Sequence, residues 1–228
     1  MVTQEQTSEY ASTRQKANLA QARSFLMLDP CRPPATLDRS ACADIVVIDA
    51  DTCAERDGAT ATLSSTLALI GAVRRDLPSG IWLRLRPAGA NSRGLIGLAG
   101  LVEGLALPGV RTVADVEAVA RILGDTHPVL VMPVFQETIG RAEVDRVAAH
   151  PLVARLAAAR PQARSNLPQA SQAQGLPWPV NGMTPDPIDA CELMHDAVVA
   201  LCEGFGGQCV PVPSAVVDVE RLYRDPQR

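Results

Sequence analysis

The feature that most constrains the fold is a series of short apolar runs that recur along the chain. The five clearest runs are SFLML at residues 24–28, ADIVVIDA at 43–50, IWLRLR at 81–86, VEGLALP at 102–108 and VLVMPVF at 129–135. Each is rich in Val, Ile or Leu, and such runs are typical of strands that are covered on both faces. Segments with helical spacing of apolar residues lie between several of them, at residues 60–76, 112–123 and 140–150.

Strands that alternate with helices at intervals of roughly 25–30 residues indicate βα units and a parallel sheet. Weaker candidates continue the pattern, with strands at residues 154–159, 177–183 and 209–213 and a helix at 189–203. The total of about eight strands favours an α/β fold of the (β/α)8 barrel type over an open sheet. Because such barrels typically need about 250 residues, the 228 residues of this chain predict a compact barrel with short loops or helices.

Two segments depart from this pattern. Residues 1–22 are polar and predict an N-terminal arm, which leaves residues 23–228 as a single barrel domain. Residues 161–175, PQARSNLPQASQAQG, are rich in Ala, Gln and Ser and have no apolar period. Since this stretch follows the candidate for strand six, it predicts either a flexible segment or a partly eroded βα unit.

The composition excludes several classes of function. A net charge of −4 argues against a nucleic-acid partner, which needs a basic stripe on the protein. No stretch of the sequence approaches the roughly 18 apolar residues of a membrane-spanning helix, and the polar N-terminus lacks the apolar core of a signal peptide. We therefore expect a cytoplasmic protein with no membrane partner. The six cysteines form no CxxC pair, so we expect reduced, buried thiols.

Polar residues at the ends of the predicted strands give the candidate site, because active-site groups of such barrels lie at the carboxyl ends of strands. Asp49 and Asp51 follow the second run, and Arg84 and Arg86 lie in the third. Carboxylates and arginines at one rim predict a site that binds an acid, with or without a divalent metal.

Each of these residues also has a structural interpretation. Asp49 and Asp51 suit the cap of a following turn. Arg84 alternates with leucines and so points into the barrel or its mouth, where it either binds an anion or pairs with Asp49 or Asp51. Arg86 either belongs to the same site or faces solvent.

The fifth run ends in Gln136 and Glu137. A carboxylate at this place is able to hold a metal, whereas an amide is a poor ligand. Both residues also suit the first turn of a helix, where the helix dipole favours Glu137. The residues themselves leave this choice open.

Taken together, these segments resemble the citrate lyase β-subunit-like branch of the HpcH/HpaI aldolase family. RSFLMLDP at 23–30 resembles the family's first strand, ADIVVIDADTCAER at 43–56 its A-D-x-V-x-x-D-L-E-D-A-V, and WLRLRP at 82–87 its V-R-[IV]-N. VEGLALPGVRTVADVEAVARIL at 102–123 is the closest stretch, and FQETIG at 135–140 falls on I-E-T-x-x-G. DPID at 186–189 and EGFGGQCVPVPSAV at 203–216 complete a likeness that covers residues 23–225.

The resemblance implies a (β/α)8 barrel that cleaves or forms carbon–carbon bonds in acyl-thioester or oxo-acid substrates. It implies Mg²⁺ held by one Glu and one Asp, which polarises the substrate carbonyl, and an arginine that grips the substrate carboxylate. The arginine maps onto Arg84, the metal Glu onto Gln136, one residue before Glu137, and the metal Asp onto about Gln162. Both metal carboxylates are therefore absent from their family positions. The family also implies a homo-oligomer.

Two interpretations follow. In the first, the chain is a carbon–carbon lyase of altered or impaired activity, with an altered or metal-free site. Asp49, Asp51 and Glu137 then build a shifted metal site, Asp49 and Asp51 join Arg84 in catalysis, and Arg84 and Arg86 bind a small dicarboxylate or acyl-thioester. In the second, it is a non-catalytic paralogue, a pseudoenzyme that serves as a binding or assembly module with an anion pocket at Arg84. The sequence leaves open whether the protein is an enzyme.

Overall fold

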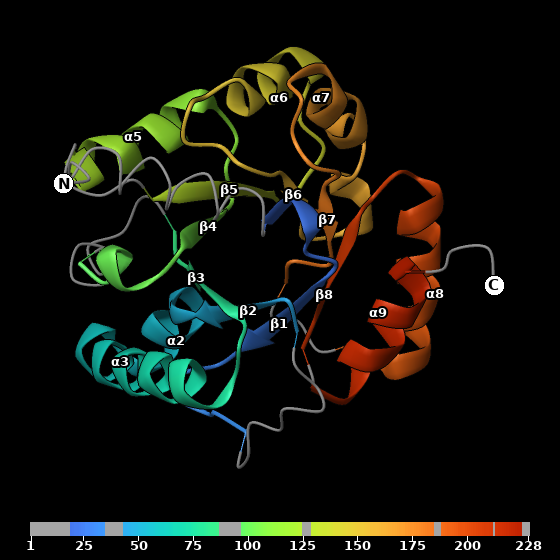
Figure 1. Ribbon diagram of the computed structural model, residues 1–228. Helices are drawn as coiled ribbons and strands as arrows, with labels where there is room; N and C mark the ends of the chain where they lie inside the picture. The colour runs from blue at the N-terminus through green and yellow to red at the C-terminus, as the bar shows by residue number, and fades with distance from the viewer. Residues whose placement is uncertain are drawn as a thin grey trace, which may run out of the picture.

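Eight parallel strands form a closed barrel with helices on its outside (Figure 1). The computed structural model describes residues 19–34, 43–86, 97–124, 129–184, 188–211 and 213–224. The strands are β1 Ser24–Leu28, β2 Ile45–Asp49, β3 Gly80–Arg84, β4 Gly104–Pro108, β5 Leu130–Phe135, β6 Ala157–Ala158, β7 Val180–Asn181 and β8 Gly207–Val210. Each strand pairs with the next, and β8 pairs with β1 to close the barrel. The predicted (β/α)8 fold is therefore confirmed.

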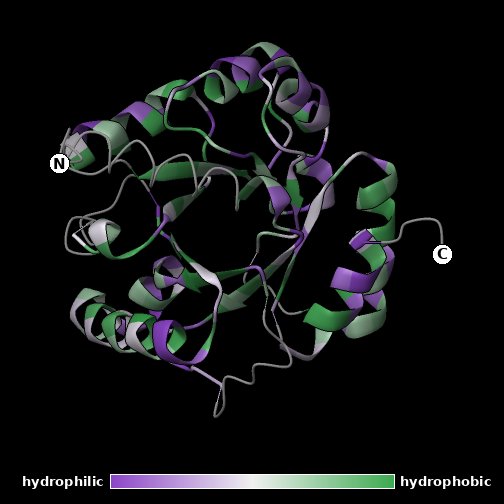
Figure 2. Cartoon of the chain, in the orientation of Figure 1, coloured by the Kyte–Doolittle hydropathy of each residue, from purple (hydrophilic) through white to green (hydrophobic). Residues whose placement is uncertain are grey.

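The helices form a ring around the strands (Figure 1). They are α2 Ala50–Asp57, α3 Ala59–Asp76, α5 Val113–Leu123, α6 Arg141–Ala148, α7 Leu167–Ala173, α8 Ala190–Cys202 and α9 Val216–Arg224, with the short turns η2 Ala99–Leu101, η4 Pro161–Ala163 and η5 Pro213–Ala215. Figure 2 shows largely hydrophobic strands, whereas most helices mix hydrophobic and hydrophilic residues. None of the helices in the described ranges has the length and apolar character needed to cross a membrane.

Apolar side chains that point inward fill the barrel, and a second apolar layer joins the strands to the helices. The inner layer includes Phe25, Val47, Trp82 and Met132. Trp82 is large for such an interior and is accommodated because the neighbouring strand begins with glycine. A Cβ atom on Gly104 would lie 2.5 Å from the indole ring, so any larger residue there requires Trp82 to move.

The region around strand six is the thinnest part of the wall. β6 and β7 have 2 residues each and α7 has 7, whereas β5 has 6. The segment 161–175 folds as η4 followed by α7, and Asn166 fastens it by donating a hydrogen bond to the Ile139 carbonyl at 3.0 Å. This segment is therefore an eroded βα unit, the second of the two alternatives that its composition predicts.

The amino ends of the strands form a floor in which Arg155 is buried. Arg155 is 1% exposed and donates hydrogen bonds of 2.7 Å to the carbonyl oxygens of Leu19, Ala22 and Trp178. Its guanidinium carbon lies 5.3 Å from the centroid of the Phe25 ring. Burial lowers the pKa of Arg155 to about 9, which still leaves it charged at neutral pH. Arg155 therefore ties the chain before β1 to the segments that enter β6 and β7.

The predicted division into an arm and a barrel domain after residue 22 stays a prediction, since residues 1–18 lie outside the described residues. Leu19 and Ala22, the described end of that arm, are buried at 2% exposure each. The last residues before β1 thus pack as part of the barrel floor.

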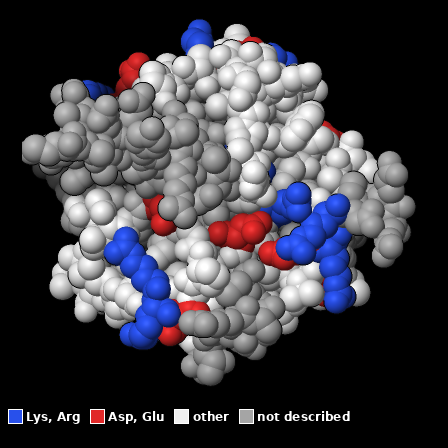
Figure 3. Space-filling view, in the orientation of Figure 1, with Lys and Arg blue, Asp and Glu red and all other residues white. Residues whose placement is uncertain are grey.

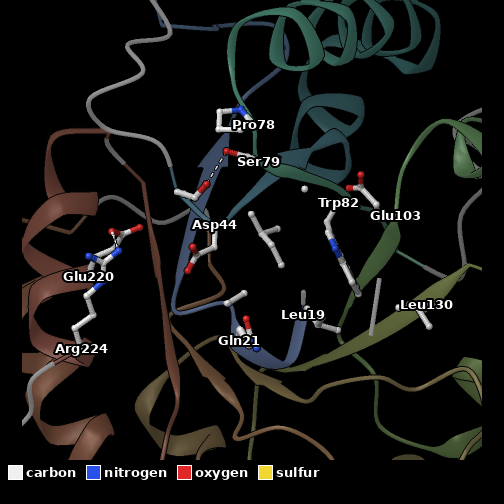
Figure 4. Close-up of a pocket in the computed structure, with 14 residues that line it drawn as sticks. Leu19, Gln21, Asp44, Pro78, Ser79, Trp82, Glu103, Leu130, Glu220 and Arg224 are labelled. Atoms are coloured by element: carbon white, nitrogen blue, oxygen red, sulfur yellow. Dashed lines mark hydrogen bonds and ion pairs between the residues drawn. The ribbon is translucent and has the colours of Figure 1, made fainter. Parts of the chain in front are cut away.

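A cavity of about 550 Å³ opens at the amino ends of the strands (Figure 4). Figure 4 shows Trp82 and Glu103 on one side of it and Glu220 and Arg224 on the other. These carboxylates already have partners, because Glu103 accepts the backbone N–H of Ile81 and Glu220 pairs with Arg224 at 3.3 Å. Since the active sites of (β/α)8 barrels lie at the opposite face, we assign this cavity to the architecture of the floor.

Replacing Glu103 with Gln is expected to stabilise the protein at neutral pH. Burial raises the pKa of Glu103 above its ordinary value of 4.5, and the Ile81 N–H and the charge of Arg74 oppose the rise. Because the folded state then binds the proton more tightly than the unfolded state, the free energy of unfolding falls as the pH rises through the window between the two pKa values. Glu103→Gln lacks this loss, while its amide oxygen still accepts the Ile81 N–H.

Urea titrations of both proteins at several values between about pH 4 and pH 8 measure this difference. The free energy of unfolding of the variant should exceed that of the wild type by a margin that grows as the pH rises. A difference in unfolding midpoint that stays constant across the whole pH range would show that the Glu103 carboxyl has the same pKa in the folded and unfolded states.

Candidate functional site at the barrel mouth

The carboxyl ends of β2 and β3 bring Asp49 and Arg84 together at the mouth of the barrel. The two residues end their strands in register, and Arg84 Nη1 lies 2.7 Å from Asp49 Oδ1. Their side chains are 5% and 3% exposed, respectively. Asp49 also caps α2 by accepting the N–H of Thr52 at 3.2 Å. Both parts of the structural interpretation of these residues, the cap and the ion pair, are therefore present.

Asp51 and Arg86 extend this pair into a cluster of four residues, the mouth cluster (Asp49, Asp51, Arg84 and Arg86). Asp51 Oδ1 accepts the backbone N–H of Arg86 at 3.1 Å, and Asp51 Oδ2 lies 3.1 Å from Arg86 Nη2 and 3.7 Å from Arg84 Nη1. Arg86 also pairs with Glu55 at 2.9 Å. Arg86 thus faces solvent, with its side chain 47% exposed, and also pairs with Asp51 and Glu55.

The mouth cluster itself balances two carboxylates with two guanidinium groups, and Glu55 adds a third carboxylate beside Arg86. Burial raises the pKa of Asp51, and the charges of Arg84 and Arg86 oppose that rise. Asp51 Oδ2 and Arg84 Nε are buried and make no hydrogen bond within the described part of the chain, although both residues belong to ion pairs. Because Asp51 Oδ2 already lies 3.1 Å from Arg86 Nη2, Arg84 Nε is the position that a ligand acceptor is able to satisfy, since buried polar atoms normally have partners.

The residues that the sequence resemblance assigns to metal positions lie on the turns after β5 and β6. Gln136 is exposed, and its Oε1 lies 3.5 Å from where a Cβ on Gly109 would be, beside the turn after β4. Glu137 is also exposed and pairs with Arg111 at 2.9 Å. Gln162 lies in η4, and its backbone carbonyl accepts a hydrogen bond from the hydroxyl of Thr138 in the turn after β5. The structure thus joins the two turns that the resemblance pairs.

Potential metal ligands gather elsewhere. In the described ranges, one group of three His, Cys, Asp or Glu side chains has ligand atoms close enough for a single ion: Asp29, Cys31 and Cys53, within 4.8 Å of one another. Cys31 and Cys53 form a disulfide, so the expectation of reduced thiols is wrong for this pair. The expectation fails because β1 and β2 lie side by side and bring together two cysteines that are 22 residues apart. Among the described free cysteines, Cys209 is buried and the other two are exposed.

A cavity of about 510 Å³ lies beside the mouth, between the carboxyl ends of β6 to β8 and the inner side of α8. Its volume falls within the range of about 300–1,000 Å³ that is usual for ligand pockets. Polar side chains of its lining include Arg160, Thr184, Glu192 and His195. The thinness of the wall at strand six therefore coincides with space for a ligand.

Cys209 connects this cavity to the mouth cluster. It lines the cavity from β8, and its thiol feels the charges of both Arg84 and Asp49. Burial raises the pKa of Cys209 to about 12, so the group is a neutral thiol at physiological pH. Cys209 is therefore a residue of the cavity lining that lies within electrostatic range of Arg84 and Asp49.

A buried polar network at the back of this cavity has no counterpart in the sequence interpretation. Arg164 is 5% exposed, donates to Asn181 Oδ1 at 2.8 Å and pairs with Asp196 and, at 3.2 Å, with Glu203. Asn181 donates in turn to Asp196 at 2.7 Å. Because Arg164 lies in a segment without periodicity and its partners are distant in the chain, no local pattern signals the network.

Charges on one face of the molecule are segregated rather than continuous. Figure 3 shows acidic side chains near the centre of the view and basic side chains to either side of them. Groups of both signs therefore lie next to one another on the described part of this face.

Fold and mouth together define a class of protein, a (β/α)8 barrel with an acid–arginine cluster at the carboxyl ends of β2 and β3. The citrate lyase beta subunit of M. tuberculosis complexed with oxaloacetate and magnesium is similar, with a TM-score of 0.68, 23% identity and coverage of 91% of this chain and 99% of that chain. The M. tuberculosis protein CitE with magnesium, acetoacetate and coenzyme A has a TM-score of 0.67, 22% identity and coverage of 90% and 82%. The magnesium and glyoxylate complex of Haloferax volcanii malate synthase has a TM-score of 0.71, 13% identity and coverage of 92% and 76%.

The TM-scores of 0.67–0.71 establish a shared fold, and the fold is the one that the sequence resemblance implies. No protein-family model matches the chain, and no curated protein matches it.

Proposed function

We propose that the protein binds a small oxo-acid or an acyl-thioester at the barrel mouth, and that the Mg²⁺-dependent lyase chemistry of citrate lyase β-like barrels is impaired in it. The similar M. tuberculosis structures contain oxaloacetate, or acetoacetate with coenzyme A, and the similar malate synthase contains glyoxylate. Because this chain shares their fold, ligands of these classes are the first to consider.

The observation that carries the proposal is the set of donors at the family's metal positions. Gln136 and Gln162 offer neutral amides, and the carboxylate of Glu137 is paired with Arg111 at 2.9 Å. Mg²⁺ prefers a near-octahedral set of hard oxygen ligands that includes carboxylates. These side chains do not fit Mg²⁺, so no step of the proposed function depends on the metal.

The mouth cluster does not replace the missing ligands. Asp49 and Asp51 already face Arg84 and Arg86, so a divalent cation beside them would meet two guanidinium groups at close range. An anion fits better, because Arg84 Nε is a buried donor without a partner. In this proposal Asp49 and Asp51 position Arg84 and Arg86, and Arg84 donates to a ligand carboxylate.

The cavity beside the mouth supplies room for the rest of the ligand. Its lining combines apolar side chains, such as Ile188 and Leu193, with the polar groups of Arg160 and His195. Pockets of this kind, largely apolar with few polar groups, fix the orientation of small ligands.

Titration of chelator-stripped protein with Mg²⁺ by calorimetry, with and without oxaloacetate, tests the proposal. We expect no saturable Mg²⁺ binding up to about millimolar metal, and binding of oxaloacetate that is equal in the presence and absence of Mg²⁺. Saturable one-site Mg²⁺ binding that oxaloacetate strengthens would overturn the impaired-lyase proposal. Failure of oxaloacetate, acetoacetate and coenzyme A thioesters to bind would overturn the proposed ligand class.

The double variant Gln136→Glu with Gln162→Asp restores carboxylates at both positions. It is expected to gain Mg²⁺ binding that the wild type lacks, because the turns that carry these residues are already joined. Glu137→Gln, which removes the neighbouring carboxylate, is the matched control and should behave like the wild type. If Glu137→Gln abolishes the Mg²⁺ binding when it is added to the double variant, Glu137 rather than position 136 holds the metal, and the assignment of position 136 is wrong.

A further inference from the structure

The Cys31–Cys53 disulfide joins the loop after β1 to α2 beside the mouth cluster. The two residues are 22 positions apart, with Cα atoms 6.5 Å from each other. Cys53 is 1% exposed, whereas Cys31 is only partly buried. Cys31 is therefore the more accessible of the two residues to a reagent in solution.

An ionic clamp surrounds the disulfide. Arg56 of α2 holds both carboxylate oxygens of Asp29, at 2.8 and 3.3 Å, and its Nε donates to Asp57 at 2.7 Å. Arg56 Nη2 also lies 3.8 Å from the Cys53 sulfur. Asp29 in turn accepts the backbone N–H of Cys31 at 2.8 Å. The loop is thus held to α2 by one covalent bond and one ion pair.

We propose that Cys31–Cys53 is a reversible thiol–disulfide modification site whose reductant is a dithiol, either a small molecule or a protein. A thiolate of the dithiol attacks the sulfur of Cys31, the more accessible of the two residues, the Cys31–Cys53 bond breaks, and Cys53 leaves as a thiolate. The second thiolate of the dithiol then attacks the mixed disulfide, and Cys31 leaves. Two electrons pass from the dithiol, which becomes a disulfide, and its two protons end on Cys31 and Cys53.

The surroundings of the two sulfurs favour this direction of attack. Exchange is faster when the attacked sulfur is accessible and when the leaving thiolate is stabilised. Arg56 Nη2 and Asp57 Oδ2 lie 3.8 Å and 3.6 Å from the Cys53 sulfur, so their opposite charges offset each other at the leaving group. Accessibility therefore assigns the two roles, with Cys31 attacked and Cys53 leaving.

Reduction affects the mouth because α2 carries half of the mouth cluster. Asp49 caps α2 and Asp51 lies in its first turn, both just before Cys53. Among the described residues, cleavage of the disulfide leaves the Asp29–Arg56 ion pair between the loop and α2, and surface ion pairs stabilise weakly. Reduction therefore loosens α2 and weakens ligand binding. This effect on binding rests on the proposed function, whereas the modification itself does not.

Redox titration of the full-length protein tests the modification. The protein is equilibrated in mixtures of reduced and oxidised dithiothreitol, alkylated, and analysed by peptide mass spectrometry. Cys31 and Cys53 should become reactive together in a single reversible transition, while the exposed Cys191 reacts throughout. Alkylation of Cys31 and Cys53 at the oxidising limit would overturn the proposal. Stoichiometric uptake of Zn²⁺ with no disulfide after chelation would also overturn it and make the group a metal site.

Amide hydrogen exchange measures the structural consequence. Residues 29–34 and 50–57 should exchange at least about tenfold faster in the reduced protein, as expected for a segment that opens locally. Cys31→Ser should show the fast pattern in both buffers, and Cys191→Ser should respond as the wild type does. Equal exchange in the two redox states would reject the effect on α2.

Oxaloacetate titrations in both redox states separate this inference from the proposed function. Tighter binding by the oxidised protein supports the coupling, and equal binding rejects it. Absence of binding in both states rejects the proposed ligand, while the alkylation experiment still decides the fate of the disulfide.

Discussion

Arg155→Ala is expected to lower the free energy of unfolding by about 4 kcal/mol. Each buried carbonyl left without a donor costs about 1–3 kcal/mol, and Arg155 serves those of Leu19, Ala22 and Trp178. The loss of the buried side chain from its place against Phe25 adds a packing cost. The floor of the barrel should therefore open before the rest of the wall.

Denaturant unfolding followed by circular dichroism measures the loss, and two variants identify its cause. Arg155→Met keeps most of the volume without any donor, so it should lose nearly as much stability as Arg155→Ala. Arg155→Lys keeps the charge but has fewer hydrogen-bond donors, so its free energy of unfolding should lie between those of the wild type and Arg155→Met. If Arg155→Met were as stable as the wild type, packing rather than hydrogen bonding would be the contribution of this residue.

Arg84→Met should cost about 3–5 kcal/mol, because removal of one partner leaves a buried charge uncompensated. The charge left behind is Asp49, whose side chain is 5% exposed and 2.7 Å from Arg84 Nη1. Asp49→Leu should cost a similar amount, since it orphans Arg84 and removes the cap of α2. The double variant should be more stable than the sum of the two losses predicts, since buried ion pairs are often replaceable by apolar residues.

A double-mutant cycle on unfolding free energies measures the coupling between Arg84 and Asp49. We expect it at the upper end of the usual range of about 0.5–3 kcal/mol for residues in contact. Additive losses would mean that the pair is not coupled in solution. Arg84→Lys then separates stability from binding, because it keeps the charge but lacks the planar fork that grips a carboxylate. The loss of binding free energy for oxaloacetate should be larger than the loss of unfolding free energy.

The strands that sequence reasoning located best are those with continuous apolar runs. The run at residues 24–28 coincides with β1, and that at 129–135 differs from β5 by one residue at its start. β8 begins two residues earlier than its candidate at 209–213, because Gly207 and Gln208 are not apolar. Gln208 is nonetheless buried, since its amide accepts a hydrogen bond from Asn181 at 2.7 Å. A search for apolar runs therefore misses strand residues whose buried side chains are polar.

In the candidate site, too, the contacts between neighbouring strand ends were predictable and the contacts between distant segments were not. The pairing of Arg84 with Asp49 was predictable as one alternative, because both end neighbouring strands of a parallel barrel. The disulfide and the Arg164 network were not, because each depends on contacts between distant segments that share no pattern. The roles of Gln136 and Gln162 stay predictions from the resemblance, with the binding experiments as their test.

The positions of the two tryptophans have a practical consequence for optical spectroscopy. Trp82 is 2% exposed inside the barrel, and Trp178 is 52% exposed at the floor beside Arg155. A buried indole emits at shorter wavelength than a solvated one, so the emission spectrum of the native protein has two components. Quenching by iodide should remove the long-wavelength component first, and each fluorophore then reports separately on the inside of the barrel and on its floor.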